Sequence, residues 1–145
     1  YVMYAKVGAG EEETGVGKGL VDIFTTGGAF VKRFATGGLL NAPWGVALAP
    51  ATFDNDNDQD KQLLLVGNFG DGRINAYRAA DGKFVGQLTR KDKSVIEIEG
   101  LWALSFPPST STIDPNRLYF TAGPDDEEDG LFGYLIRDKS NGDTY

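Results

Sequence analysis

The sequence predicts an all-β chain built from a repeated unit of four short strands. Three observations support this prediction. Similar segments recur at spacings of 53 to 58 residues, and each copy divides into short apolar or alternating stretches bounded by glycine. No stretch keeps a helical period over three turns. Four strands in a repeat of roughly 40–58 residues are typical of a β-propeller blade, so we expect a partial β-propeller.

The repeat is most evident at two tryptophans. Trp44 and Trp102 open similar segments 58 residues apart, and Asp71–Tyr77 resembles Asp129–Leu135 at the same spacing. An earlier copy begins at Gly17–Phe24, which resembles the segment 53 residues later. Two equal spacings and a third of nearly the same length indicate three copies of one unit.

The central copy predicts four strands. Leu63–Val66 is continuously apolar, as expected of a strand buried on both faces, and Arg73–Arg78 alternates. Asp81 and Gly82 supply the hairpin turn that follows. The predicted strands are Trp44–Ala49, Leu63–Gly67, Arg73–Arg78 and Lys83–Leu88.

The other two copies predict three strands each. In the first they are Tyr1–Val7, Leu20–Thr25 and Ala29–Ala35, and in the third Trp102–Phe106, Arg117–Thr121 and Leu131–Ile136. We therefore expect a single partial domain over 1–145, with antiparallel blades at 1–38, 39–92 and 93–145, about two and a half in all. A propeller closes with four to eight blades. We expect the open edges to pair with the remainder of the same polypeptide or with a second chain.

Composition excludes several classes of site. The chain has no cysteine, which excludes a disulfide framework and a Cys-based zinc site, and no histidine, which excludes a Ser-His-Asp triad. A net charge of −7 disfavours nucleic acid as a partner. No run of 18 apolar residues predicts a transmembrane segment. A strand begins at Tyr1 with no leader before it, so we expect the chain to be part of a longer protein.

Three segments hold 12 of the 21 acidic residues: Glu11–Glu13, Asp54–Asp60 and Asp125–Asp129. Propeller geometry places the first and third on one face, together with Asn68 and Asp71. Convergent carboxylates without histidine suit Ca²⁺, which prefers oxygen ligands. The candidate metal ligands are Asp71, Asp125, Asp126 and Glu127, and the alternative is that these loops are only solvated. Asp54–Asp60 lacks the Gly and Glu of an EF-hand loop and is interpreted as a polar loop on the other face.

Trp44 and Trp102 occupy equivalent positions at the start of predicted strands. One interpretation is that they pack neighbouring blades together. The other is that they form aromatic platforms at the mouth of a central channel, where a sugar or another ring could stack. Trp44, Trp102, Asn68 and Asp71 are the candidate ligand-binding residues.

The assembled segments resemble a family of predicted β-propeller proteins related to NHL-type repeats, whose function is not established. The resemblance implies a six-bladed propeller, of which this chain is the C-terminal part, and an extracellular or otherwise exported location. It implies no activity. The segments that carry it are Leu39–Pro50, Leu64–Tyr77, Gly82–Leu88, Gly100–Leu104, Leu118–Glu127 and Asp129–Gly133.

Two functions fit these observations. The first is an exported binding or structural module that uses its acidic loop face, with a small molecule, a glycan or a protein as partner. No catalytic residue is assigned in this case. The alternative is a metal-dependent lactonase or esterase on an NHL-like six-bladed propeller, where a cation held by Glu, Asn and Asp side chains polarises an ester and activates water.

Overall fold

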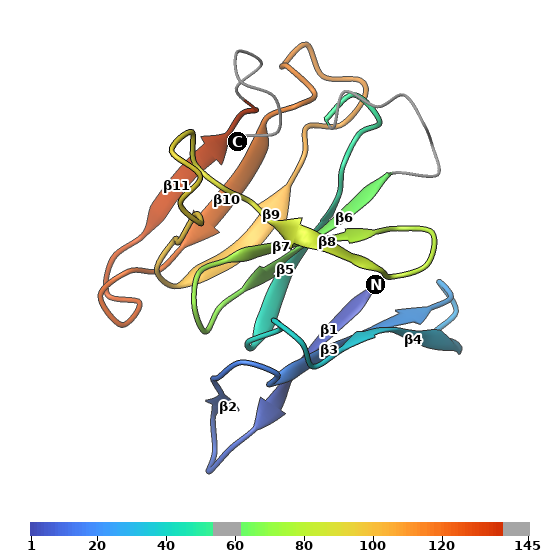
Figure 1. Cartoon of the computed structure of the whole chain (residues 1–145), viewed down its shortest axis with the longest axis vertical. Coiled ribbons are helices and arrows are strands. Elements are labelled where there is room, and N and C mark those ends of the chain that lie inside the picture. The colour runs from blue at the N-terminus through green and yellow to red at the C-terminus, as the bar shows by residue number, and fades with distance from the viewer. Residues whose placement is uncertain (54–61, 138–145) are drawn as a thin grey trace.

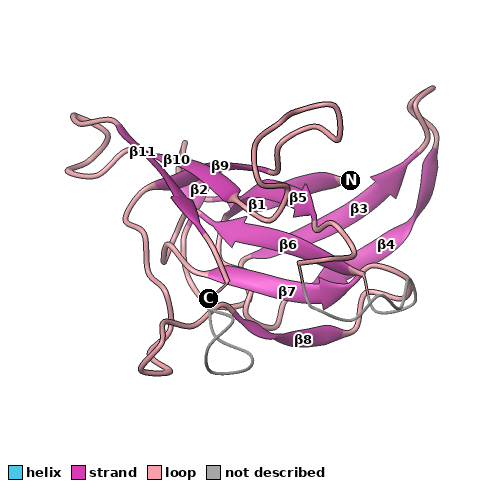
Figure 2. Cartoon of the chain, turned by 90° about the horizontal axis from the view of Figure 1, so that it is seen from above, coloured by secondary structure: helices cyan, strands magenta, loops and turns pink. Residues whose placement is uncertain are grey.

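The computed structural model describes residues 1–53 and 62–137, which form eleven strands in three antiparallel sheets (Figure 1). Figure 2 shows strands and loops alone in this part of the chain. The prediction of an all-β fold is confirmed. The described ranges contain no helix long and apolar enough to cross a membrane.

The middle sheet is a meander of four consecutive strands, as the central copy of the repeat predicts. The six residues of its second strand are all buried, which confirms a strand covered on both faces. The predicted turn is confirmed as well, because Gly82 has a φ of +78° and an Asp81 carboxylate oxygen accepts the Lys83 N–H. The strands are β5 (Pro43–Leu48), β6 (Leu63–Asn68), β7 (Ile74–Arg78) and β8 (Phe84–Gln87).

The first sheet contains a strand that the sequence does not predict. Its order is β2-β1-β3-β4, and β2 holds only two residues, which pair with Lys6 and Val7 at the end of β1. Two residues are too few to show an alternation of apolar and polar side chains, so this strand is recognised only by its pairing with β1. The strands are β1 (Val2–Val7), β2 (Glu12–Glu13), β3 (Gly19–Phe24) and β4 (Phe30–Thr36).

The third sheet has three strands, in the order β11-β10-β9. They are β9 (Leu101–Ser105), β10 (Leu118–Ala122) and β11 (Leu131–Leu135). In the described part of the chain no strand lies beyond β11, where Phe132 is 70% exposed. This sheet therefore has an unpaired outer edge.

Two apolar clusters lie on opposite faces of the middle sheet. Leu63, Leu65 and Ile74 face the third sheet, where Leu101 and Leu118 complete the larger cluster. The smaller cluster, toward the first sheet, consists of Val21, Phe34, Leu40, Leu64, Val66 and Tyr77. Alternate residues of β6 thus enter different clusters, which explains its uninterrupted apolar sequence.

The first strands of the middle and third sheets lie side by side. β5 contacts both β1 and β9, between which it lies in Figure 1. A Cβ atom at Gly45 would be 2.5 Å from the Trp102 carbonyl oxygen, so only glycine allows the two backbones to approach this closely. At Gly19, a Cβ atom would be 2.8 Å from Cγ of Pro43. The approach at Gly45 brings together the two segments that carry the tryptophans.

Candidate functional site

An open groove with a volume of about 510 Å³ joins residues from all three sheets. Two tryptophans and two glutamates line it: Glu12, Trp44, Trp102 and Glu127. Glu12 lies in β2 and Trp44 in β5, whereas Trp102 lies in β9 and Glu127 follows β10. We call this feature the tryptophan groove.

Trp44 presents its side chain to solvent. It lies between Pro43 and Gly45, which are both buried, and strand alternation turns it outward, where it is 55% exposed. The Phe69 ring supports it, with the ring centroids 6.2 Å apart and the planes inclined by 48°. Among residues 1–53 and 62–137, Trp44 is thus not a buried contact between sheets.

Trp102 is held on two sides. A Cβ atom at Gly123 would be 2.7 Å from Cη2 of the indole, so the ring lies directly against the Gly123 backbone. Its Nε1–H donates a hydrogen bond of 2.9 Å to Oε1 of Glu127. The indole is half-buried and its orientation is fixed.

A left-handed turn carries Glu127 to the indole. Asp125, Asp126 and Glu127 have φ values of 53°, 50° and 67°, a conformation that costs roughly 1–2 kcal/mol for each L-residue. The Glu128 N–H donates to the Asp125 carbonyl oxygen at 3.0 Å, and the Asp125 N–H donates to Oε1 of Glu99 at 3.2 Å. Such strain is concentrated at functional sites, and here it orients a groove residue.

Glu12 reaches the groove because β2 pairs with the end of β1, where Glu12 stands opposite Val7. Its neighbour Glu13 forms an ion pair with Lys18 at 2.5 Å. The hydrogen bond from Lys18 and its charge lower the pKa of Glu13. Lys18 thus compensates the Glu13 carboxylate rather than Glu12.

Asn68 and Asp71, two of the candidate ligand-binding residues, do not line the groove and instead join the loop before β5 to the β6–β7 loop. Asn68 is fully buried, and its Nδ2 donates to the Leu39 carbonyl oxygen at 2.8 Å and to Oδ1 of Asp71 at 3.1 Å. Its Oδ1 accepts the Asn41 N–H at 3.1 Å. Asp71 Oδ1 also accepts the Arg73 N–H. Both ends of the Asn68 amide are used internally, which gives this residue a structural role.

The candidate metal ligands do not gather around one point. Of Asp71, Asp125, Asp126 and Glu127, only Glu127 lines the tryptophan groove. Across residues 1–53 and 62–137, no three His, Cys, Asp or Glu side chains are grouped so that they could hold a metal ion. The Asp54–Asp60 loop lies outside the described residues.

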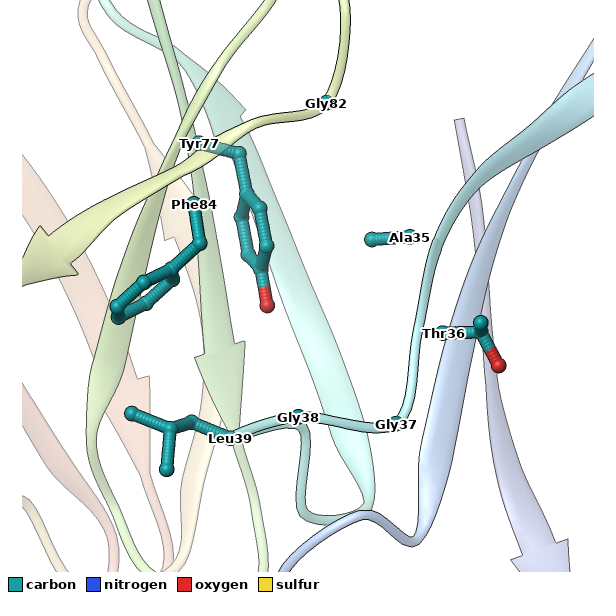
Figure 3. Close-up of a pocket in the computed structure, with 8 residues that line it drawn as sticks. All are labelled: Ala35, Thr36, Gly37, Gly38, Leu39, Tyr77, Gly82 and Phe84. Atoms are coloured by element: carbon teal, nitrogen blue, oxygen red, sulfur yellow. The ribbon is translucent and has the colours of Figure 1, made fainter.

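A second hollow of about 290 Å³ lies beside Tyr77 and Phe84 (Figure 3). The two rings make an edge contact with centroids 5.6 Å apart, and burial raises the pKa of Tyr77 to about 12. The Thr36 hydroxyl points away from the Tyr77 ring in Figure 3. The hollow thus offers fewer polar groups than the tryptophan groove. Its lining residues are Ala35, Thr36, Gly37, Gly38, Leu39, Tyr77, Gly82 and Phe84.

Comparison with known proteins finds similar sequences in Acanthamoeba polyphaga mimivirus. An uncharacterized protein of this virus is 37% identical over 142 residues, which cover 96% of this chain and 33% of the relative. A second is 37% identical over 123 residues, covering 85% of the chain and 30% of the relative. A third is 32% identical over 111 residues, covering 77% of this chain and 19% of the relative. The chain thus spans a third or less of the length of these relatives.

No protein-family model matches the chain, and no solved structure matches it. The tryptophan groove is therefore interpreted from its own chemistry. Sequence reasoning identified both tryptophans and placed Glu11–Glu13 and Asp125–Asp129 on one face. It missed the supporting Phe69, although this residue follows an apolar strand in the repeat, where loop residues are expected to position a site. It considered the carbonyls near Gly123 as cation ligands, not as a support for Trp102.

Proposed function

We propose that the chain is part of an exported β-propeller binding module and that its three sheets are successive blades. Two features support the blade arrangement: the middle sheet is a four-stranded meander, and its first strand, β5, contacts β9, the first strand of the third sheet. First strands that lie together are expected where blades surround a common axis. The export part of the proposal rests on the resemblance to exported proteins.

The ligand site of this module is the tryptophan groove. The observation that carries the proposal is that Trp44 and Trp102, at equivalent positions of two sheets, line one groove with two carboxylates. Aromatic faces provide contact area for a ring or a methylated group, and a few polar groups fix its orientation. Among the described residues nothing covers the Trp44 ring fully, since it is 55% exposed, so its face is available to a ligand.

Binding is favoured over the lactonase or esterase alternative by the same geometry. A hydrolytic cation would need several oxygen ligands around one point. In the described structure, the groove holds only Glu12 and Glu127 as acidic residues. Calcium binding is tested by calorimetry: heat that is lost in Asp126→Asn would support a metal site, and the absence of heat and of a thermal shift would remove it.

The binding proposal can be tested by fluorescence because Trp44 and Trp102 are the two tryptophans of the chain. Tryptophan emission should change and saturate with a member of a panel of soluble saccharides, heteroaromatic compounds and small organic cations. Trp102→Ala should abolish the binding, whereas Phe132→Ala, which removes an exposed ring elsewhere, should not. Binding that survives Trp102→Ala, or no response to any class, would contradict the proposal.

The blade proposal has its own test. In a crystal structure of the longer polypeptide, we expect a fourth strand beside β11 and the first strands of all blades around one axis. Sheets stacked face to face as a sandwich, with β11 still at an edge, would contradict it.

A further inference from the structure

We propose that the tryptophan groove binds an organic cation whose charged nitrogen carries methyl groups, such as a trimethylammonium group. This inference rests on the proposed binding function of the groove and assigns its ligand class. It follows from the negative charge of the groove, from the two indole rings that line it and from the contacts that support its walls.

The carboxylates of the groove form no ion pair within the described chain. Neither Glu12 nor Glu127 forms an ion pair with a Lys or Arg of the described residues, and the groove is lined by no basic side chain. Four other acids do form such pairs: Glu13 with Lys18, Asp22 with Arg33, Asp81 with Arg78 and Glu97 with Arg73. The negative charge of the groove is therefore available to a ligand.

The two indoles suit a cation with an apolar surface. The face of an indole carries the negative part of the ring quadrupole, and it attracts quaternary ammonium groups through their methyl groups. The hydrogen bond from Trp102 Nε1–H to the Glu127 carboxylate polarises the ring and increases this attraction. A hard metal ion would gain little from the indole faces, since it prefers oxygen ligands. A neutral sugar would gain no Coulombic attraction from the two carboxylates, which are both exposed.

The groove walls are supported before any ligand binds. Phe69 lies against Trp44, the Gly123 backbone lies against Trp102, and the left-handed turn at Asp125–Glu127 holds the carboxylate on the indole. A preformed site loses less side-chain entropy on binding, so a small ligand can gain measurable affinity from few contacts.

The test compares choline with its uncharged isostere, in which carbon replaces the quaternary nitrogen, and with methyl glucoside as a neutral sugar. Each compound is titrated into the chain and followed by tryptophan fluorescence and calorimetry. Choline should bind with saturation, and the isostere, which has the same shape, should bind about tenfold more weakly because it lacks the attraction to the rings and carboxylates. Added salt should weaken choline binding alone.

Two pairs of variants locate the effect. Glu127→Gln keeps an oxygen that can accept the Trp102 N–H but removes the charge, and should weaken choline binding about tenfold. Glu128→Gln, its neighbour outside the groove, should leave binding unchanged. Glu12→Gln should likewise weaken choline binding, and its control, Glu11→Gln, should leave binding unchanged. Circular dichroism of each variant should match that of the parent chain, which shows that the fold is retained.

The outcomes separate this inference from the binding function itself. Equal affinity for choline and the isostere, or binding of methyl glucoside without choline, would overturn the organic-cation assignment and leave the binding function in place. If Glu127→Gln and Glu128→Gln weaken choline binding equally, the cation does not bind in the groove. No response to any compound of the wider panel would overturn both proposals.

Discussion

Replacing Asn68 with alanine tests whether this residue is structural. The substitution removes the three hydrogen bonds that tie the end of β6 to Leu39, Asn41 and Asp71. At about 1 kcal/mol for each bond, Asn68→Ala should lower the free energy of unfolding by about 3 kcal/mol. The Leu39 carbonyl oxygen still accepts a bond from Nδ2 of Asn75, but the Asn41 N–H loses its acceptor. For a chain of 145 residues, the expected fall in Tm is on the order of 10 °C.

Urea unfolding followed by circular dichroism measures this loss. The matched control is Asn116→Ala, which removes one exposed hydrogen bond, from the Thr52 hydroxyl to Oδ1 at 2.8 Å. The control should cost about 0.5 kcal/mol or less. If Asn68→Ala costs no more than Asn116→Ala, the Asn68 amide is not structural, and a role in ligand binding regains support.

Three further predictions concern the groove, the second hollow and the core. Gly123→Ala should displace the Trp102 indole and weaken choline binding about tenfold in a fluorescence titration, whereas Gly130→Ala, where an added Cβ meets no atom within 4 Å, should have no effect. Burial raises the pKa of Tyr77 to about 12. The free energy of unfolding measured in urea should therefore fall as the pH rises from about 10 to about 12. Tyr77→Phe should remove the part of this fall that comes from Tyr77. Equal pH profiles of the variant and the parent chain would contradict the prediction. Leu65→Ala, at a fully buried position of β6, should cost about 2–5 kcal/mol of unfolding free energy, and a loss below about 1 kcal/mol would contradict the assigned core.

The strands could be predicted because their signals are local. Leu63–Val66 is apolar without interruption, and both of its faces are covered by separate clusters. The repeat then transferred this assignment to the other copies. β2 could not be predicted, because its two residues form a strand only through the register with Lys6 and Val7.

The site could be predicted in part. Equivalent positions in the repeat identified Trp44 and Trp102, but the bond from Trp102 to Glu127 depends on a left-handed turn that contains no glycine to signal it. Asn68 was interpreted as a ligand because polar loop residues often bind. Its burial depends on Leu39 and Asn41, which are distant in sequence and approach it only in the folded chain.

The most direct test of the groove is a proton–nitrogen NMR titration of the isotopically labelled chain with choline. The chain has two tryptophans, so it gives two indole N–H signals, and both belong to the groove. Both signals should move with the same dissociation constant, and the Trp102 signal should also report any change in its bond to Glu127. Two indole signals that stay in place while choline reaches high excess would contradict the central claim.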